Sequence, residues 1–321
     1  MSYYYDAFRQ CFFLPAPTFT EKELPDQTGR VLIVTGGYAG VGKELCKMLY
    51  QKNGTVYLAG RSEDKAKAAI SEIKQSITSS DGRLEFLKVD LADLPSIKGS
   101  VQEFMRREQR LDVLTNNAGV MAPPVGTKSA QNYEVQMGTN CLGPFLLTKL
   151  LTPLLEKTAS TSAPGSVRVT WAASLATAAA PKGGVQFDAS GGPRVHNDRF
   201  ADYAQTKASN CLLASEYQSR YGGKGRIVSN SWNPGNLMSE LQRHQQGFEA
   251  WFTKLLCYPP HFGGYTELFA GWSEEAGKPE HRGKYVGPWG RFVMLRSDIE
   301  ANKEGAKKFW EWCEQETKPY A

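Results

Sequence analysis

One run near the N-terminus constrains this chain more than any other feature. Residues 31–45 read Val-Leu-Ile-Val-Thr-Gly-Gly-Tyr-Ala-Gly-Val-Gly-Lys-Glu-Leu. Four apolar, mostly β-branched residues predict a buried parallel strand, and Leu45 and Leu49 begin the apolar stripe of a helix. A strand, a glycine-rich turn and a helix in this order predict the first unit of an α/β fold with a parallel sheet.

The glycines of this run predict a phosphate site. They let the backbone approach a ligand closely and present free N–H groups at a helix N-terminus, where a pyrophosphate fits. With Thr35 in front, their spacing resembles the TGxxxGxG turn of the short-chain dehydrogenase/reductase family rather than the usual GxGxxG. The resemblance implies a set of cofactor contacts at Thr35, Gly36, Tyr38, Gly40, Val41 and Gly42.

The end of the second predicted strand, residues 55–59, favours a particular cofactor. In a Rossmann unit this end meets the adenosine ribose, where an acid binds the free 2′-hydroxyl and an Arg accommodates a 2′-phosphate. Here Gly60 and Arg61 supply one cation and no acid, which favours NADP(H), with Ser62 as a further phosphate ligand. Alternatively, Arg61 is only a solvated charge at the start of the next helix.

A third strand, residues 84–89, is closed by Asp90. The resemblance implies that Asp90 hydrogen-bonds the adenine amino group. An N-cap for the helix that begins near Leu94 is the alternative role, and Asp93 is also placed to fill it.

A fourth strand, residues 111–114, leads into Asn116, Asn117, Ala118 and Gly119. This tetrad matches the NNAG of the family. The match implies that Asn117, Ala118 and Gly119 line the adenosine side of the cofactor, although spacing alone is also that of an ordinary turn.

Tyr203 and Lys207 are the candidate catalytic pair, and both are also predicted to contact the cofactor, Lys207 through the nicotinamide ribose hydroxyls. Four residues apart, they share one face of a helix predicted for 204–220. A phenol can donate the proton that carbonyl reduction requires, and a neighbouring ammonium is expected to lower the pKa of the phenol. An isolated match of this spacing would be an ordinary amphipathic helix, but here it follows the cofactor elements in the family's order.

Two further residues complete the predicted catalytic set. Ser174 lies just beyond a strand at 167–171, where open α/β sheets place their ligands, and would stabilise charge on the substrate oxygen. Asn140 interrupts an apolar helix predicted for 133–155, which requires a buried partner. The resemblance implies that Asn140 holds a water in a proton relay, and a purely structural role is the alternative.

The segment after a sixth strand at 227–232 resembles the family's Pro-Gly segment, which holds the nicotinamide carboxamide. The match implies contacts from Pro234, Gly235, Leu237 and Ser239, although the structural alternative is a simple turn. Residues 236–265, rich in aromatic side chains, occupy the place of the substrate lid and favour an apolar substrate, although half of them are equally compatible with core packing.

A short last strand is predicted at 285–286.

Composition excludes several classes of protein. The net charge of +5 comes from scattered Lys and Arg, without the basic blocks of a nucleic-acid groove. No apolar run is long enough for a membrane span or a signal peptide. The six cysteines form no CxxC pair, which predicts no metal site and reduced thiols in the cytoplasm.

We therefore predict a single-domain, Rossmann-like, doubly wound parallel α/β sheet at residues 29–321, preceded by an extension at 1–28. The predicted function is an NADP(H)-dependent oxidoreductase that interconverts a carbonyl and an alcohol on an apolar small molecule. The resemblance is to fungal members, many of which act in secondary metabolism, and it implies a homodimer paired through the Asn140 and Tyr203 helices. A non-catalytic dinucleotide sensor and an epimerase or dehydratase on this fold are the alternatives.

Overall fold

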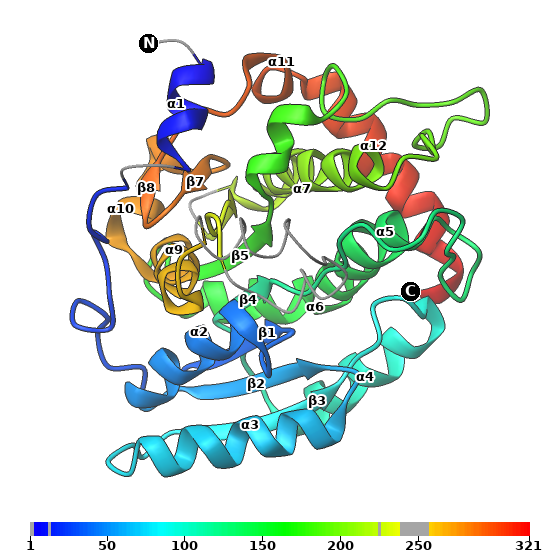
Figure 1. The fold of residues 1–321 in the computed structure, drawn as a ribbon. Coiled ribbons are helices and arrows are strands. Elements are labelled where there is room, and N and C mark those ends of the chain that lie inside the picture. The colour runs from blue at the N-terminus through cyan, green and yellow to red at the C-terminus, as the bar shows by residue number, and fades with distance from the viewer. Residues whose placement is uncertain (1–2, 12–13, 224–225, 238–256) are drawn as a thin grey trace.

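A computed structural model describes residues 3–11, 14–223, 226–237 and 257–321 (Figure 1). Its centre is an eight-stranded sheet in the order β3-β2-β1-β4-β5-β6-β7-β8. Neighbouring strands are parallel except β7 and β8, which are antiparallel. The strands are β1 (Val31–Thr35), β2 (Thr55–Gly60), β3 (Arg83–Lys88), β4 (Val113–Asn116), β5 (Val167–Ala172), β6 (Ile227–Trp232), β7 (Tyr285–Gly287) and β8 (Arg291–Phe292).

Helices cover both faces of this sheet, as predicted for a doubly wound fold (Figure 1). One face carries α2 (Gly40–Gln51), α3 (Glu63–Ser76) and α9 (Pro260–Trp272), and the other carries α4 (Leu94–Arg107), α6 (Gly143–Ser160) and α7 (Arg199–Tyr221). Strand β1 shows why both faces need cover. Val31 and Ile33 belong to one apolar cluster and Leu32 and Val34 to the other. The remaining helices are α1 (Tyr3–Arg9), α5 (Val135–Met137), α10 (Glu274–Gly277), α11 (Ser297–Glu300) and α12 (Lys303–Thr317), with the 3₁₀ turns η2 (Leu175–Ala179), η5 (Pro279–His281) and η6 (Lys318–Tyr320).

Two predicted helices differ in detail from the structure. Helix α7 begins at Arg199, five residues before the predicted start, because the Asp198 carboxylate accepts the N–H groups of Phe200 and Ala201. The helix around Asn140 is not a continuous α-helix, since residues Gly138–Leu142 form a π-helical turn, η1, between α5 and α6. Such turns often occur at functional sites.

Helix α12 packs across α7 and α6 on the side away from the sheet (Figure 1). The Trp310 ring lies 4.8 Å from the Phe145 ring and 4.9 Å from the Arg220 guanidinium. Lys149 pairs with Glu314 at 3.5 Å. Part of the outer face of the Asn140 and Tyr203 helices, which the resemblance assigned to a second copy, is therefore occupied by the chain's own C-terminal helix.

The N-terminal extension is packed against the body of the protein. Leu24 and Gln27 are buried, and the Gln27 side-chain oxygen accepts hydrogen bonds from Trp272 and Arg30, both at 2.9 Å. Farther toward the N-terminus, Thr18 donates to the backbone oxygen of Gly290. The extension is thus part of the folded structure rather than a loose tail.

Candidate active site

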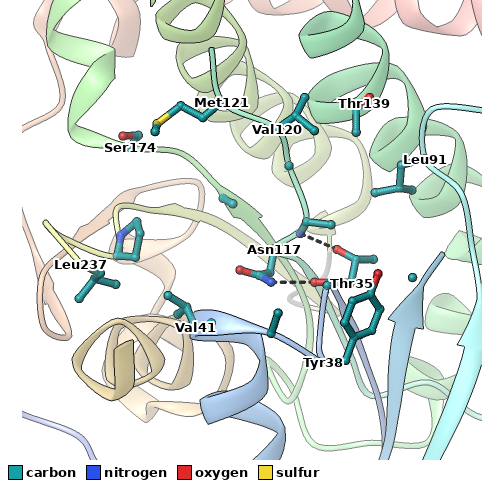
Figure 2. A pocket seen from close by; sticks show the side chains of 18 of the residues that line it. Thr35, Tyr38, Val41, Leu91, Asn117, Val120, Met121, Thr139, Ser174 and Leu237 are labelled. Carbon is teal, nitrogen blue, oxygen red and sulfur yellow. Dashed lines mark hydrogen bonds between the residues drawn. The ribbon is translucent and has the colours of Figure 1, made fainter. Parts of the chain in front are cut away.

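A cleft of about 1000 Å³ opens at the carboxyl ends of the parallel strands. This is the edge where open α/β sheets bind their ligands, and the volume is at the upper end of the range for small-molecule sites. Of the predicted site residues, the lining includes Thr35, Gly36, Tyr38, Gly40, Val41, Arg61, Ser62, Asp90, Asn117, Ala118, Gly119, Ser174, Tyr203, Lys207, Pro234, Gly235 and Leu237. Figure 2 shows several of these side chains around the cleft.

The glycine turn has the geometry of an anion cradle. Gly36 and Gly40 have φ of +69° and +51°, values that favour glycine. Helix α2 begins at Gly40, and its N-cap Ala39 provides no side-chain acceptor, so the first N–H groups are free of a side-chain cap. A Cβ on Gly40 would meet nothing within 4 Å, which leaves the turn open to a ligand. These features fit the diphosphate of a dinucleotide.

Gly42, which the sequence predicts as a cofactor contact, is not among the residues that line the cleft. It is buried, and a Cβ there would lie 2.5 Å from Nδ2 of Asn117 and 2.9 Å from the oxygen of Gly36. The residue therefore has to be glycine for packing, since α2 lies directly on the turn and on Asn117. It supports the phosphate turn from behind.

Thr35 and Asn117 join the ends of β1 and β4 (Figure 2). The Thr35 hydroxyl accepts the Ala118 N–H at 2.9 Å, and the Asn117 side chain donates to the Thr35 backbone oxygen at 2.8 Å. The Asn116 side chain points elsewhere and donates to Thr148 at 2.9 Å. The Asn-Asn-Ala-Gly segment is thus a fixed wall of the cleft rather than an ordinary exposed turn.

At the end of β2, the Tyr38 ring lies over Gly60, since a Cβ on Gly60 would come within 2.3 Å of that ring. The Tyr38 hydroxyl accepts the N–H of Arg61 at 3.2 Å, which holds the chain where the exposed Arg61 side chain begins. Ser62 caps α3 by accepting the Lys65 N–H at 3.4 Å. The Ser62 hydroxyl hydrogen stays available to donate to a phosphate.

Asp90 lines the cleft, and its carboxylate accepts the N–H of Ala92 at 3.0 Å. It is not the N-cap of α4. Asp93 occupies that position, but the Leu94 N–H goes to the Gln131 side chain at 2.9 Å instead.

Tyr203, Ser174 and Lys207 come together at the other end of the cleft. Tyr203 and Lys207 lie on α7 with only 8% and 5% of their surfaces exposed, and Ser174 follows β5. The Ser174 side chain lies beside Tyr203, where it acts to lower the pKa of the phenol. The Lys207 Nζ donates to the backbone oxygen of Ala172 at 3.0 Å and lies 5.6 Å from the centre of the Tyr203 ring.

The pKa of Tyr203 is shifted in the direction opposite to that expected from the sequence. Burial raises it to about 12, and the neighbouring Ser174 side chain only partly opposes this. Burial also lowers the pKa of Lys207 to about 8. The physical reason is that desolvation penalises both charged forms, while the ammonium bonds to the Ala172 carbonyl rather than to the phenol.

Asn140 lies behind the cleft and does not line it. Its side chain bonds twice to Val120, accepting the N–H at 2.8 Å and donating to the oxygen at 2.9 Å, and it donates to Thr206 at 3.1 Å. The buried partners that the sequence required are therefore present. They tie the wall at Val120 to the residue next to Lys207, which is a positioning role.

The segment after β6 forms the remaining wall. Gly235 has φ of +88°, and a Cβ there would lie 3.2 Å from Pro288, so this turn is closely packed. Leu237 pairs with Tyr258 in a short parallel bridge beside the cleft. Ser239 and residues 238–256 of the predicted lid lie outside the described residues.

Sequence reasoning missed several lining residues. Lys65 is the most informative, because it adds a second cation beside Arg61 and follows the capping Ser62 by three residues, a spacing readable from the sequence. The others are mostly apolar and carry no local signal. They are Ala39, Ala59, Gly60, Val89, Leu91, Val120, Met121, Thr139, Ala172, Ala173, Trp232, Asn236 and Cys257.

The described part of the chain was compared with the requirements of a metal site, a disulfide and a membrane-spanning helix. It contains no group of three or more His, Cys, Asp or Glu side chains that could hold a metal ion. It records no disulfide. None of its helices combines the length and apolar character needed to cross a bilayer.

Comparison with known proteins identifies the family. The sequence pattern described as short chain dehydrogenase matches residues 30–167. A protein of Phomopsis amygdali named short-chain dehydrogenase/reductase is 47% identical, over 96% of this chain and 95% of its own length. The chain belongs to the short-chain dehydrogenase/reductase family. This confirms the family resemblance that the sequence indicated.

Solved structures of the same fold support the assignment. A protein from Mycobacterium paratuberculosis superposes with a TM-score of 0.67 at 26% identity, covering 94% of this chain and 97% of its own. The Pseudomonas aeruginosa RhlG/NADP active-site complex gives a TM-score of 0.63 at 21% identity, covering 81% and 95%. The predicted Rossmann-like fold of this short-chain dehydrogenase/reductase is confirmed.

Proposed function

We propose that this short-chain dehydrogenase/reductase uses NADP(H) to interconvert a carbonyl and an alcohol on an apolar small molecule. The observation that carries the proposal is the meeting of Tyr203, Ser174 and Lys207 in the cleft that also contains the glycine turn. A nicotinamide bound there supplies or accepts the hydride. The residues of the chain handle the proton and the developing charge.

In the reductive direction, the Tyr203 hydroxyl donates its proton to the substrate oxygen. Ser174 donates a hydrogen bond to the same oxygen as negative charge develops on it. Loss of the proton would leave a phenolate with a pKa near 12, which is unfavourable at neutral pH. The Lys207 ammonium, 5.6 Å from the ring centre, stabilises that phenolate, and Asn140 keeps Lys207 in place through Thr206.

The choice of NADP(H) rests on charge at the end of β2. Arg61 and Lys65 line the cleft there, and no carboxylate occupies the position of a ribose-binding acid. Ser62 adds a hydroxyl donor beside them. The name of the RhlG structure records NADP in that protein's active site, which is consistent with this choice.

An apolar substrate fits the walls near Ser174. Val120, Met121 and Leu237 surround that end of the cleft in Figure 2, and Trp232 also lines it. We place the reaction in the cytoplasm because the cysteines that the structure describes form no disulfide. We place it in secondary metabolism on the resemblance to fungal members.

We further propose that the enzyme acts as a monomer rather than as the predicted homodimer. Pairing through α6 and α7 would require α12 to leave Phe145 and Arg220, which it contacts through Trp310. Light scattering on the purified chain is expected to give the mass of one copy, 35.5 kDa. Twice that mass would contradict this part of the proposal.

The test is NADPH consumption by the purified protein over a panel of ketones, aldehydes and quinones, with Tyr203→Phe beside the wild type. We expect the variant to lose turnover by about 10²- to 10⁴-fold, the usual contribution of a general acid, while still binding NADPH. Turnover that survives the substitution would rule out Tyr203 as the proton donor. NADPH binding without turnover on any substrate would favour the non-catalytic sensor.

A further inference from the structure

The N-terminal helix α1 is connected to the wall of the cleft by a chain of hydrogen bonds, of which the bond between Gln10 and Asn233 is buried. Gln10, which follows this helix, is only 4% exposed. Its side-chain oxygen accepts a hydrogen bond from Nδ2 of Asn233 at 3.2 Å. The oxygen of the same Asn233 side chain accepts the Gly235 N–H at 3.1 Å. Gly235 lines the cleft.

The other end of this chain of bonds is also fixed. The Gln10 amide donates to the Asp6 carboxylate at 3.1 Å, and the same carboxylate accepts the Met294 N–H at 3.0 Å. Each amide thus donates on one side and accepts on the other, in the order Asp6, Gln10, Asn233, Gly235. The hydrogen bonds therefore run in one direction. A carboxylate at position 6 can only accept, so the Gln10 amide turns its NH₂ group toward Asp6 and its oxygen toward Asn233.

A second contact runs parallel to the first. The Cys11 thiol donates to the backbone oxygen of Ala7 at 3.5 Å and lies near the side chain of Asn236, another residue that lines the cleft. Asn233 itself is 1% exposed and has no access to water as a substitute partner. The position of the 234–236 turn therefore depends on residues more than two hundred positions earlier in the sequence.

We propose that Gln10 is a positioning residue, which sets the Pro234–Leu237 turn so that it can hold the nicotinamide end of the cofactor. This inference rests on the proposed function, because it assumes that a nicotinamide occupies that end. The extension at residues 1–28 then belongs to the active site, although it carries none of the family's motifs. Gln10 touches neither substrate nor cofactor and acts only through Asn233.

The experiment compares two ligands of the full-length protein. NADPH spans the whole cleft, whereas 2′,5′-ADP carries only the adenosine half and its 2′-phosphate. Gln10→Ala leaves Asn233 without its acceptor, and we expect NADPH affinity to fall about five- to tenfold while 2′,5′-ADP affinity stays the same. The KM for NADPH is expected to rise more than kcat falls.

Gln27→Ala is the matched control. Gln27 is also a buried glutamine of the extension, but its side chain bonds to Trp272, Arg30 and Pro25 rather than to the cleft wall. It is expected to lower thermal stability and to leave the ratio of the two affinities unchanged. If both variants change the ratio equally, or if Gln10→Ala leaves it unchanged, the positioning role is wrong.

A pair of substitutions tests the direction in which these hydrogen bonds run. Asn233→Asp replaces the NH₂ donor by a carboxylate oxygen, so that two acceptors face each other at Gln10, and this variant is expected to bind NADPH more weakly. Adding Asp6→Asn allows the Gln10 amide to turn over and donate to the carboxylate introduced at position 233, so NADPH affinity is expected to recover at least about threefold in the double variant. No recovery contradicts the proposal. Wild type that binds 2′,5′-ADP but not NADPH, or neither, would instead contradict the proposed function.

Discussion

The two ends of the cleft are built in different ways. The adenosine end is assembled mainly from residues 35–65, a continuous stretch of strand, turn, helix and strand, and its cations Arg61 and Lys65 are exposed. The end at Ser174 is buried and is assembled from β5, α7, the segment after β6 and the extension behind it. One end of the cleft thus comes largely from a single stretch of sequence, whereas the other end requires segments from most of the chain.

This difference has an energetic consequence. Exposed cations contribute to affinity in small, separable amounts, because water can replace a lost contact. A buried hydroxyl or ammonium whose partner is removed has no such substitute. Substitutions at the adenosine end should therefore change binding gradually, and those at the Ser174 end should change turnover sharply.

A pair of serine substitutions tests the comparison most directly, because Ser174 and Ser62 both cap a helical turn by accepting an N–H. We expect Ser174→Ala to lower kcat about 10²- to 10³-fold, the usual cost of one donor to a developing oxyanion. Ser62→Ala is expected to weaken NADPH binding a few-fold with kcat unchanged. Steady-state kinetics of both variants give kcat and the KM for NADPH. Similar kcat values for the two variants would contradict the assignment of catalysis to the Ser174 end and of binding to the adenosine end.

The second prediction concerns Arg61. Its removal takes away a charge-assisted contact to the 2′-phosphate, so Arg61→Ala is expected to weaken NADPH binding about 10- to 100-fold and NADH binding little. Lys67→Ala is the control, since Lys67 lies on the helix that follows but pairs with Glu63 at 2.7 Å. Titration of intrinsic fluorescence measures all four affinities. Equal losses for the two cofactors would contradict the phosphate assignment.

The third prediction concerns pH. Because burial lowers the pKa of Lys207 to about 8, its ammonium is lost above that pH, and carbonyl reduction is expected to fall by up to about tenfold per pH unit. NADPH affinity, set at the other end, should not follow this profile. A kcat that stays flat to about two units above this pKa would show that the ammonium is not required.

The contribution of Lys207 to the free energy of unfolding should rise with pH, whereas the rate of carbonyl reduction falls. The unfolded lysine keeps its ordinary pKa of 10.5, so between about 8 and 10.5 the unfolded state binds more protons than the folded state. The contribution of Lys207 to the free energy of unfolding therefore rises with pH across this window. Urea unfolding of wild type and Lys207→Met at several pH values isolates that contribution.

The smallest expected effect is at Tyr285, whose hydroxyl donates to the backbone oxygen of Ser174 at 3.0 Å. Tyr285→Phe removes one supporting hydrogen bond and is expected to lower kcat roughly two- to tenfold. Tyr217→Phe is the matched control, because that buried hydroxyl contacts Thr152 away from the cleft. Equal kcat values in the two variants would show that Ser174 needs no such support.

The amino-acid sequence determined the sheet, the glycine turn and most of the polar residues that line the cleft, because these features are local. Apolar strands bounded by turns predicted seven of the strands, and the spacing of Tyr203 and Lys207 placed both on one helix face. Only the short antiparallel β8 was not anticipated. Its two residues, Arg291 and Phe292, are too few to carry an alternating pattern.

Only the tertiary structure decided how each residue is used. Gly42 and Asn140 match family motifs, but the packing of α2 and the π-helical turn place them behind the cleft rather than in it. The pKa of Tyr203 is raised because burial outweighs the opposing effect of Ser174, and no sequence motif specifies how deeply a side chain is buried. The contact between Gln10 and Asn233 joins residues more than two hundred positions apart, so no local pattern could predict it.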